Sequence, residues 1–118
     1  MTNTPIDIVR GGDRGRIAVL RVSGRLDSDT APRLIEQCSS VQAEGLNLVI
    51  NLSGVSFLGS SGVGALLVLV EQFQQQAGAV HFAAISESAR SVVDLLDLED
   101  YLPVHESEDD AFRALEAA

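Results

Sequence analysis

The chain contains 118 residues, of which 46% are hydrophobic and 21% charged, a composition that excludes a disordered protein and favours one globular domain over residues 1–118. Its net charge of −9 is concentrated in residues 87–118, which hold ten acidic residues and two arginines, and the chain has no lysine. Such a surface excludes nucleic acid and anionic membranes as partners. It favours either a basic protein partner or an acidic face that only maintains solubility.

The first two predicted elements form an antiparallel hairpin. Ile6 to Arg10 is typical of a short strand, and Arg16 to Ser23 carries apolar residues on both faces, as a mostly buried strand does. The glycine-rich stretch 11–15 between them is typical of a turn.

A helix is predicted after the break at residues 24–29. Asp29 or Thr30 can cap it, Pro32 is tolerated in its first turn, and Gly45 ends it. Its apolar residues recur at helical spacing and predict one buried face. They are Ala31, Leu34, Ile35, Cys38 and Val41. The single cysteine in this set excludes an intrachain disulfide and is expected to be a buried, inert thiol.

A continuous apolar run, Leu46 to Leu52, predicts a central parallel strand that is covered on both faces. Ser53 to Leu58 is expected to connect this strand to the turn at residues 59–62. A second helix then runs from about Ser61 to Gln76, and its wide apolar stripe predicts that it is largely buried.

The rest of the chain repeats the alternation of strand and helix. Val80 to Ile85 predicts a strand, Ser86 or Glu87 starts a helix, Leu102 to Val104 predicts a short edge strand, and Ser107 caps a last helix. The expected fold is therefore an α/β domain of order β-β-α-β-α-β-α-β-α. We expect a mixed, mostly parallel central sheet of about four or five strands with four helices.

Two segments carry the most specific pattern in the chain. Residues 24–27 read Gly-Arg-Leu-Asp, and residues 51–67 contain Asn-Leu-Ser followed by Gly-Ser-Ser-Gly-Val-Gly. Together they resemble the STAS family, specifically the bacterial anti-sigma factor antagonists, in which Gly-x-Leu-Asp precedes the first helix and Asp-Ser-Ser-Gly-x-Gly precedes the second. The resemblance extends over nearly the whole chain in length and element order, and it implies a single STAS domain.

The resemblance implies a partner switch rather than an enzyme, and it implies no cofactor. Such antagonists bind an anti-sigma factor that is also a Ser kinase of the GHKL type, which frees the sigma factor. The kinase phosphorylates the first Ser of the motif, the complex separates, and a Ser phosphatase resets the switch. Carried onto this chain, the phosphate acceptor is Ser60. The implied partner-contact positions are Asp27, Gly59, Ser60, Ser61, Gly62 and Val63.

The predicted position of Ser60 agrees with this assignment. It lies at a helix N-terminus beyond the carboxyl end of a central strand, where free N–H groups and the helix dipole tolerate a phosphate. A phosphate would add about −1.5 to −2 charges to the docking surface without unfolding the domain. We also expect Ser60 or Ser61 to cap the helix.

One residue departs from the family pattern. Gly59 stands where the family has Asp before the acceptor Ser, so no carboxylate is present to orient the hydroxyl or to help place the metal of a kinase. This departure supports an alternative, in which the chain is a STAS adaptor that works without phosphorylation in a signalling complex or a lipid-transport assembly.

Other sites lack the residues that they need. A Walker loop requires Lys where Ser60 stands, a dinucleotide fingerprint requires Gly at Leu67, and the serines lack the glycine spacing of a nucleophile elbow. No metal site is expected, since His81 and His105 come without a cysteine cluster. An enzyme or nucleotide binder that uses the helix start remains the least supported reading.

The first residues and the longest apolar run bear on localisation. Met1 to Pro5 lack the basic and apolar regions of a signal peptide, and the run Val63 to Val70 is too short to cross a bilayer. We expect a cytoplasmic protein without membrane insertion, monomeric when isolated.

Overall fold

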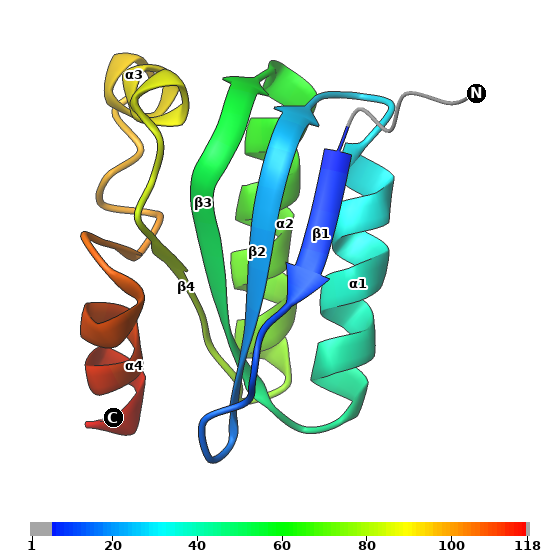
Figure 1. Ribbon diagram of the computed structural model, residues 1–118, viewed down its shortest axis with the longest axis vertical. Coiled ribbons are helices and arrows are strands. Elements are labelled where there is room, and N and C mark those ends of the chain that lie inside the picture. The colour runs from blue at the N-terminus through cyan, green and yellow to red at the C-terminus, as the bar shows by residue number, and fades with distance from the viewer. Residues whose placement is uncertain (1–5, 118) are drawn as a thin grey trace.

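The computed structural model describes residues 6–117 and consists of a five-stranded sheet with helices on both faces (Figure 1). The elements are β1 (Ile6–Arg10), β2 (Ile17–Leu26), α1 (Ala31–Ala43), β3 (Asn47–Leu58), α2 (Ser60–Gln75), β4 (Val80–Ala83), α3 (Glu87–Leu95), β5 (Val104–His105) and α4 (Glu108–Glu116). This order and the α/β class confirm the prediction from the sequence.

The strands lie in the sheet in their sequence order, β1-β2-β3-β4-β5. β1 pairs with β2 antiparallel, which confirms the predicted hairpin, and the other neighbours pair in parallel. β3 occupies the centre, and its residues Leu48, Val49 and Ile50 are fully buried. Its continuous apolar sequence is explained by burial on both faces.

Two cores lie on opposite faces of the sheet. Ala18 and Leu20 of β2 face the larger core, which includes residues of α1 and α2, whereas Ile17 and Val19 face a smaller core with Phe112 of α4. This split follows from the alternation of side chains along a strand. Cys38 lies in the larger core, where burial raises the pKa of its thiol, as expected for an inert cysteine.

A polar cluster holds α4 on the face of the sheet that carries the smaller core. Glu108, the first residue of α4, accepts hydrogen bonds from Arg21 Nε at 2.8 Å and Nη2 at 2.9 Å, and from Asn51 Nδ2 at 2.7 Å. The bonds from Arg21 lower the pKa of Glu108 more than its partial burial raises it, and Asn51 lowers it further. The carboxylate therefore joins α4 to the central strand β3 and to its neighbour β2.

Two strands are longer than predicted. β2 continues beyond Ser23 to Leu26, and β3 continues beyond Leu52 to Leu58, so the segment expected to be a connection is part of the sheet. The pairing of β2 with β3 persists through two register shifts, between Arg21 and Ser23 and between Gly24 and Arg25. Such shifts interrupt the alternation of buried and exposed residues. The sequence there lacks the period-two pattern by which a strand is predicted.

Glycines permit this irregular pairing. Gly24, at the second shift, has φ of 103°, a conformation that other residues rarely adopt. Gly54 lies opposite Ser23, and a Cβ at Gly54 would be 2.5 Å from the Ser23 Cβ. A side chain at residue 54 would separate the two strands at this point.

The later elements agree closely with the prediction. Ser86 and Ser107 cap α3 and α4, with their hydroxyl oxygens accepting from the N–H of Ala89 and Asp110 at 3.1 Å each. β4 ends at Ala83, two residues before the predicted end, and β5 lies slightly later than predicted. Within residues 6–117, no helix is both long and apolar enough to cross a bilayer.

The two histidines link the short edge strand β5 to β4. His81 Nδ1 and His105 Nε2 are 2.8 Å apart, and the ring planes differ by 5°. One nitrogen must donate and the other accept, so this hydrogen bond requires at least one neutral ring. Partial burial, and then the nearby His105, lower the pKa of His81.

This pair predicts a loss of stability in mild acid. The folded pKa of His81 lies below its ordinary value of 6.5, so the unfolded chain binds the proton more readily. The neutral His81 ring therefore contributes its full stability above pH 6.5, and this contribution is lost as pH falls through the pKa of the folded state. We expect Tm to fall between about pH 7.5 and about pH 5.5, and to fall less in His81→Gln. Thermal unfolding monitored by circular dichroism measures Tm. An equal fall of Tm in the wild type and in His81→Gln would contradict this role.

Candidate functional site

The two sequence motifs meet at the carboxyl ends of β2 and β3, where the chain turns into α1 and α2 (Figure 1). The N–H of Gly59 donates to the carbonyl of Leu26 at 2.9 Å, so the two turns are joined by a backbone hydrogen bond. Parallel pairing of β2 with β3 brings both strand ends to the same edge of the sheet. Residues about thirty positions apart in the sequence thereby form one surface.

Asp27 holds the turn that leads into α1. Its Oδ1 accepts from the N–H of Asp29 at 3.1 Å and of Thr30 at 3.3 Å, and the buried Thr30 hydroxyl donates to the carbonyl of Arg25 at 2.7 Å. Thr30 occupies the N-cap position, as predicted, but its side chain makes no capping bond. The Asp27 carboxylate instead holds the turn before the helix, and the Asp27 carbonyl accepts from the N–H of Ala31, the first residue of α1, at 2.8 Å.

The same hydrogen bonds determine the charge state of Asp27. Partial burial raises the pKa of its carboxyl, but the bonds from Asp29 and Thr30 and the charge of Arg25 outweigh that effect, and the pKa lies below its ordinary value. Asp27 is therefore ionised at neutral pH. Asp27 is also partly exposed, so a partner can reach it. Its contact with a partner stays a prediction.

Ser60 and Ser61 are exposed in the first turn of α2. The expectation that one of them caps the helix is wrong, because Gly59 occupies the N-cap position and α2 has no side-chain cap. Both serines lie inside the helix, one and two residues past the cap position. In the described part of the chain, neither hydroxyl makes a hydrogen bond.

The start of α2 presents free donors beside these hydroxyls. The first helical bond of α2 runs from the N–H of Val63 to the carbonyl of Gly59 at 3.0 Å. The N–H groups of Ser60, Ser61 and Gly62 precede it and have no acceptor within the helix. With the positive end of the helix dipole, these donors make the position favourable for a negatively charged group on Ser60.

Gly62 and Val63 support the site from beneath. Val63 is 6% exposed and belongs to the larger core. A Cβ at Gly62 would lie 2.5 Å from the carbonyl oxygen of Leu26 and 2.8 Å from Leu58 Cδ1, so glycine lets the helix start rest on the end of β2. Of the predicted contact positions, Ser60 and Ser61 are thus the most accessible, whereas Gly62 and Val63 are buried.

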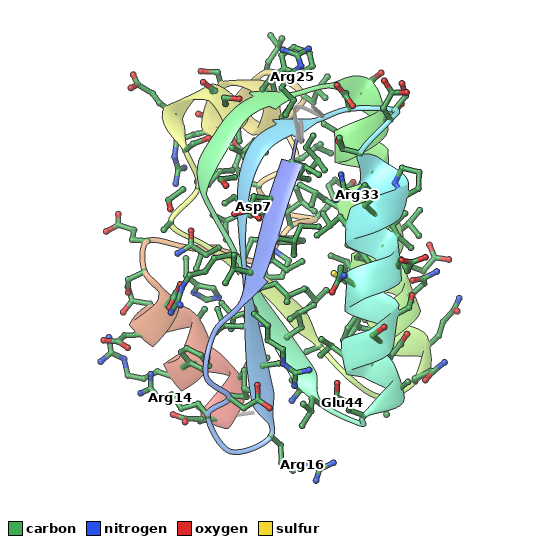
Figure 2. The ribbon with its side chains drawn as sticks, turned by 45° about the vertical axis from the view of Figure 1, so that its right-hand side comes forward. Asp7, Arg14, Arg16, Arg25, Arg33 and Glu44 are labelled. Atoms are coloured by element: carbon green, nitrogen blue, oxygen red, sulfur yellow. The ribbon has the colours of Figure 1, made fainter. Side chains whose placement is uncertain are left out.

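Two residues of this surface received no role in the sequence analysis. The Arg25 guanidinium lies 4.2 Å from the centroid of the Phe57 ring, and its Nε lies 3.5 Å from Asp27 Oδ2. Phe57 is 41% exposed, a large apolar surface for a side chain beside the exposed serines. Figure 2 shows Arg25 at the end of the molecule opposite to Arg14 and Arg16. The residues pair across β2 and β3, in the part of each strand that the sequence analysis did not predict.

Comparisons with known proteins agree with this fold. The sequence model of the STAS domain matches residues 13–111. An anti-sigma-B factor antagonist of Staphylococcus epidermidis is 30% identical over 88 residues, which cover 74% of this chain and 82% of the relative. A crystal structure of an anti-sigma factor antagonist from Mycobacterium paratuberculosis is 32% identical with a TM-score of 0.82, over 94% of each chain. The Bacillus cell fate determinant SpoIIAA, in its phosphorylated form, shares the fold at 22% identity and a TM-score of 0.68, over 92% of this chain and 98% of that one.

Two glycines of α2 provide a matched test of this packing. Gly62→Ala should destabilise the protein by about 1–3 kcal/mol, because the added methyl meets the carbonyl oxygen of Leu26 at 2.5 Å, a backbone atom that cannot yield easily. Gly64→Ala should stabilise it by about 0.5–1 kcal/mol, since nothing lies within 4 Å of a Cβ there and alanine favours the helix. Urea unfolding of both variants measures the difference. Equal free energies of unfolding would show that the close approach to Leu26 is unimportant.

Proposed function

The chain belongs to the STAS domain family, and on that basis we propose that it is an anti-sigma factor antagonist whose contact surface is the start of α2 around Ser60. The S. epidermidis and M. paratuberculosis relatives are antagonists of this kind and match most of the chain. Binding to an anti-sigma factor would release a sigma factor, and this role requires a surface rather than a catalytic group. An antagonist with this role would act in the cytoplasm, where its partner is.

The switch in this proposal is phosphorylation of Ser60. The anti-sigma factor, a Ser kinase of the GHKL type, would transfer the terminal phosphoryl group of ATP to the Ser60 hydroxyl, and a Ser phosphatase would remove it. The observation that carries the proposal is an exposed hydroxyl in a helical turn whose first N–H groups lack acceptors. Those donors suit both the hydroxyl and its phosphate ester.

The effect of the phosphate would be electrostatic rather than conformational. Ser60 is exposed, so its modification leaves the core intact, but it adds about −1.5 to −2 charges where the partner binds. A loss of about 3 kcal/mol of binding free energy changes the dissociation constant by more than a hundredfold. That change suffices to separate the complex.

A second function is favoured by Gly59, which replaces the carboxylate that precedes the acceptor in the family. Its φ of −87° and ψ of 175° are open to any residue, so the backbone does not require glycine there. The absence of a carboxylate is therefore not imposed by the backbone, and its consequence is for the chemistry beside Ser60. A member without efficient phosphate acceptance would act as an adaptor in a signalling complex or a lipid-transport assembly.

Phosphorylation can be tested with the GHKL kinases encoded by the source organism. We expect one of them to modify Ser60, as seen by mass spectrometry, to modify Ser61→Ala equally, and to leave Ser60→Ala unmodified. Ser60→Asp should weaken binding to that kinase by about a hundredfold. If no kinase acts and a partner binds Ser60→Asp as tightly as the wild type, the adaptor function is correct instead.

The role of Gly59 has its own test. Gly59→Asp should raise the rate of Ser60 phosphorylation by about tenfold or more, because the carboxylate can orient the hydroxyl. A Cβ at residue 59 would come 3.0 Å from Phe57 Cε2, and that exposed ring can move aside. Gly59→Asn is the control of equal size without the charge. Equal rates for all three proteins would show that the missing carboxylate has no consequence.

A further inference from the structure

A groove runs along α2, on the side that faces residues 99–103. Two hollows of about 300 Å³ and about 360 Å³ meet there, because both are lined by Val70, Gln74, Asp100 and Tyr101. The inner hollow reaches β4, and the outer one opens between Leu67 and Tyr101. The groove is thus formed by a helix and a segment that lie about thirty residues apart in the sequence.

The charges around this groove are all negative. The chain has no arginine between Arg33 and Arg90, so α2 contributes a carboxylate, Glu71, and no cation. Glu99 and Asp100 are exposed on the opposite side. The ion pairs within residues 6–117 use other carboxylates, which leaves these three without a cationic partner.

Apolar side chains are exposed beside these carboxylates. Tyr101 is 67% exposed, and Leu67 of α2, which lines the outer hollow with it, is 36% exposed. Large apolar side chains that remain exposed together on a surface often mark an interaction site, and tyrosine is frequent among the residues that contribute most to binding. The combination of an apolar centre and an acidic rim is complementary to a segment with the opposite charge.

We propose that this groove binds a basic amphipathic helix of a protein partner. An apolar side chain of that helix would fill the space between Leu67 and Tyr101, and its Arg or Lys residues would pair with Glu71, Glu99 and Asp100. A guanidinium can also lie over the exposed Tyr101 ring. The acidic rim favours a basic partner over an acidic one and accelerates association at low salt.

The groove begins further along α2 than the Ser60 surface. Leu67 follows Ser60 by seven residues of helix, a distance of about 10 Å along the axis. Seven residues make nearly two turns of helix, so Leu67 and Ser60 lie on the same side of α2. The proposal does not depend on phosphorylation of Ser60 or on its absence.

The experiment is a titration of the isotope-labelled full chain, monitored by NMR. The probe is a synthetic helix of about 14 residues, with leucines at helical spacing and arginines on the flanking positions. The matched probe has glutamate in place of every arginine. We expect shift changes centred on Leu67, Glu71 and Tyr101 with the basic probe alone, and weaker binding as salt is raised.

Substitutions of exposed residues then show which side chains contribute to binding of the basic probe. Tyr101→Ser should weaken binding of the basic probe by about tenfold, and Glu71→Gln with Asp100→Asn should weaken it and reduce its salt dependence. Glu36→Gln, an exposed carboxylate on α1, is the control and should bind as the wild type does. Binding of the acidic probe with equal affinity, shift changes centred elsewhere, or no saturation at millimolar concentration would overturn the proposal.

Discussion

The close contact between the end of β2 and the start of α2 is the constraint on which the rest of the structure depends. The carbonyl of Leu26 accepts a hydrogen bond from Gly59 and lies directly under Gly62, where there is no room for a side chain. This contact fixes the direction in which α2 leaves the sheet. It thereby determines which residues of the helix are buried in the larger core and which, beginning with Ser60, remain on the surface.

The order and type of the elements could be predicted because local signals agree with the tertiary structure. The continuous apolar run in β3, the serines that cap α3 and α4, and the helical spacing around Cys38 each report their own element. The strand extensions through Gly24 and Gly54 could not be predicted. Their pairing is set by a neighbouring strand, and the register shifts remove the alternation by which strands are recognised in a sequence.

The same limit applies to the candidate site. Ser60, Ser61 and Asp27 could be found because short motifs contain them, and the structure brings these motifs together. Arg25 and Phe57 interact across two strands, and Tyr101 approaches α2 from a distant segment. Contacts of this kind depend on the fold rather than on sequence spacing. The cap of α2 was wrongly assigned to the serines for a related reason, since the helix begins one residue earlier than the pattern indicated.

The backbone at Gly59 has a consequence for the history of such proteins. Its dihedral angles are open to every amino acid, and only a movable ring stands near the place of a side chain. A glycine codon that ends in a pyrimidine becomes an aspartate codon by the change of a single base. A lineage with such a codon can therefore lose or regain the carboxylate beside Ser60 through one point mutation, and the fold tolerates either residue. If Ser60 is phosphorylated as proposed, selection can adjust sensitivity to the kinase independently of the stability of the domain.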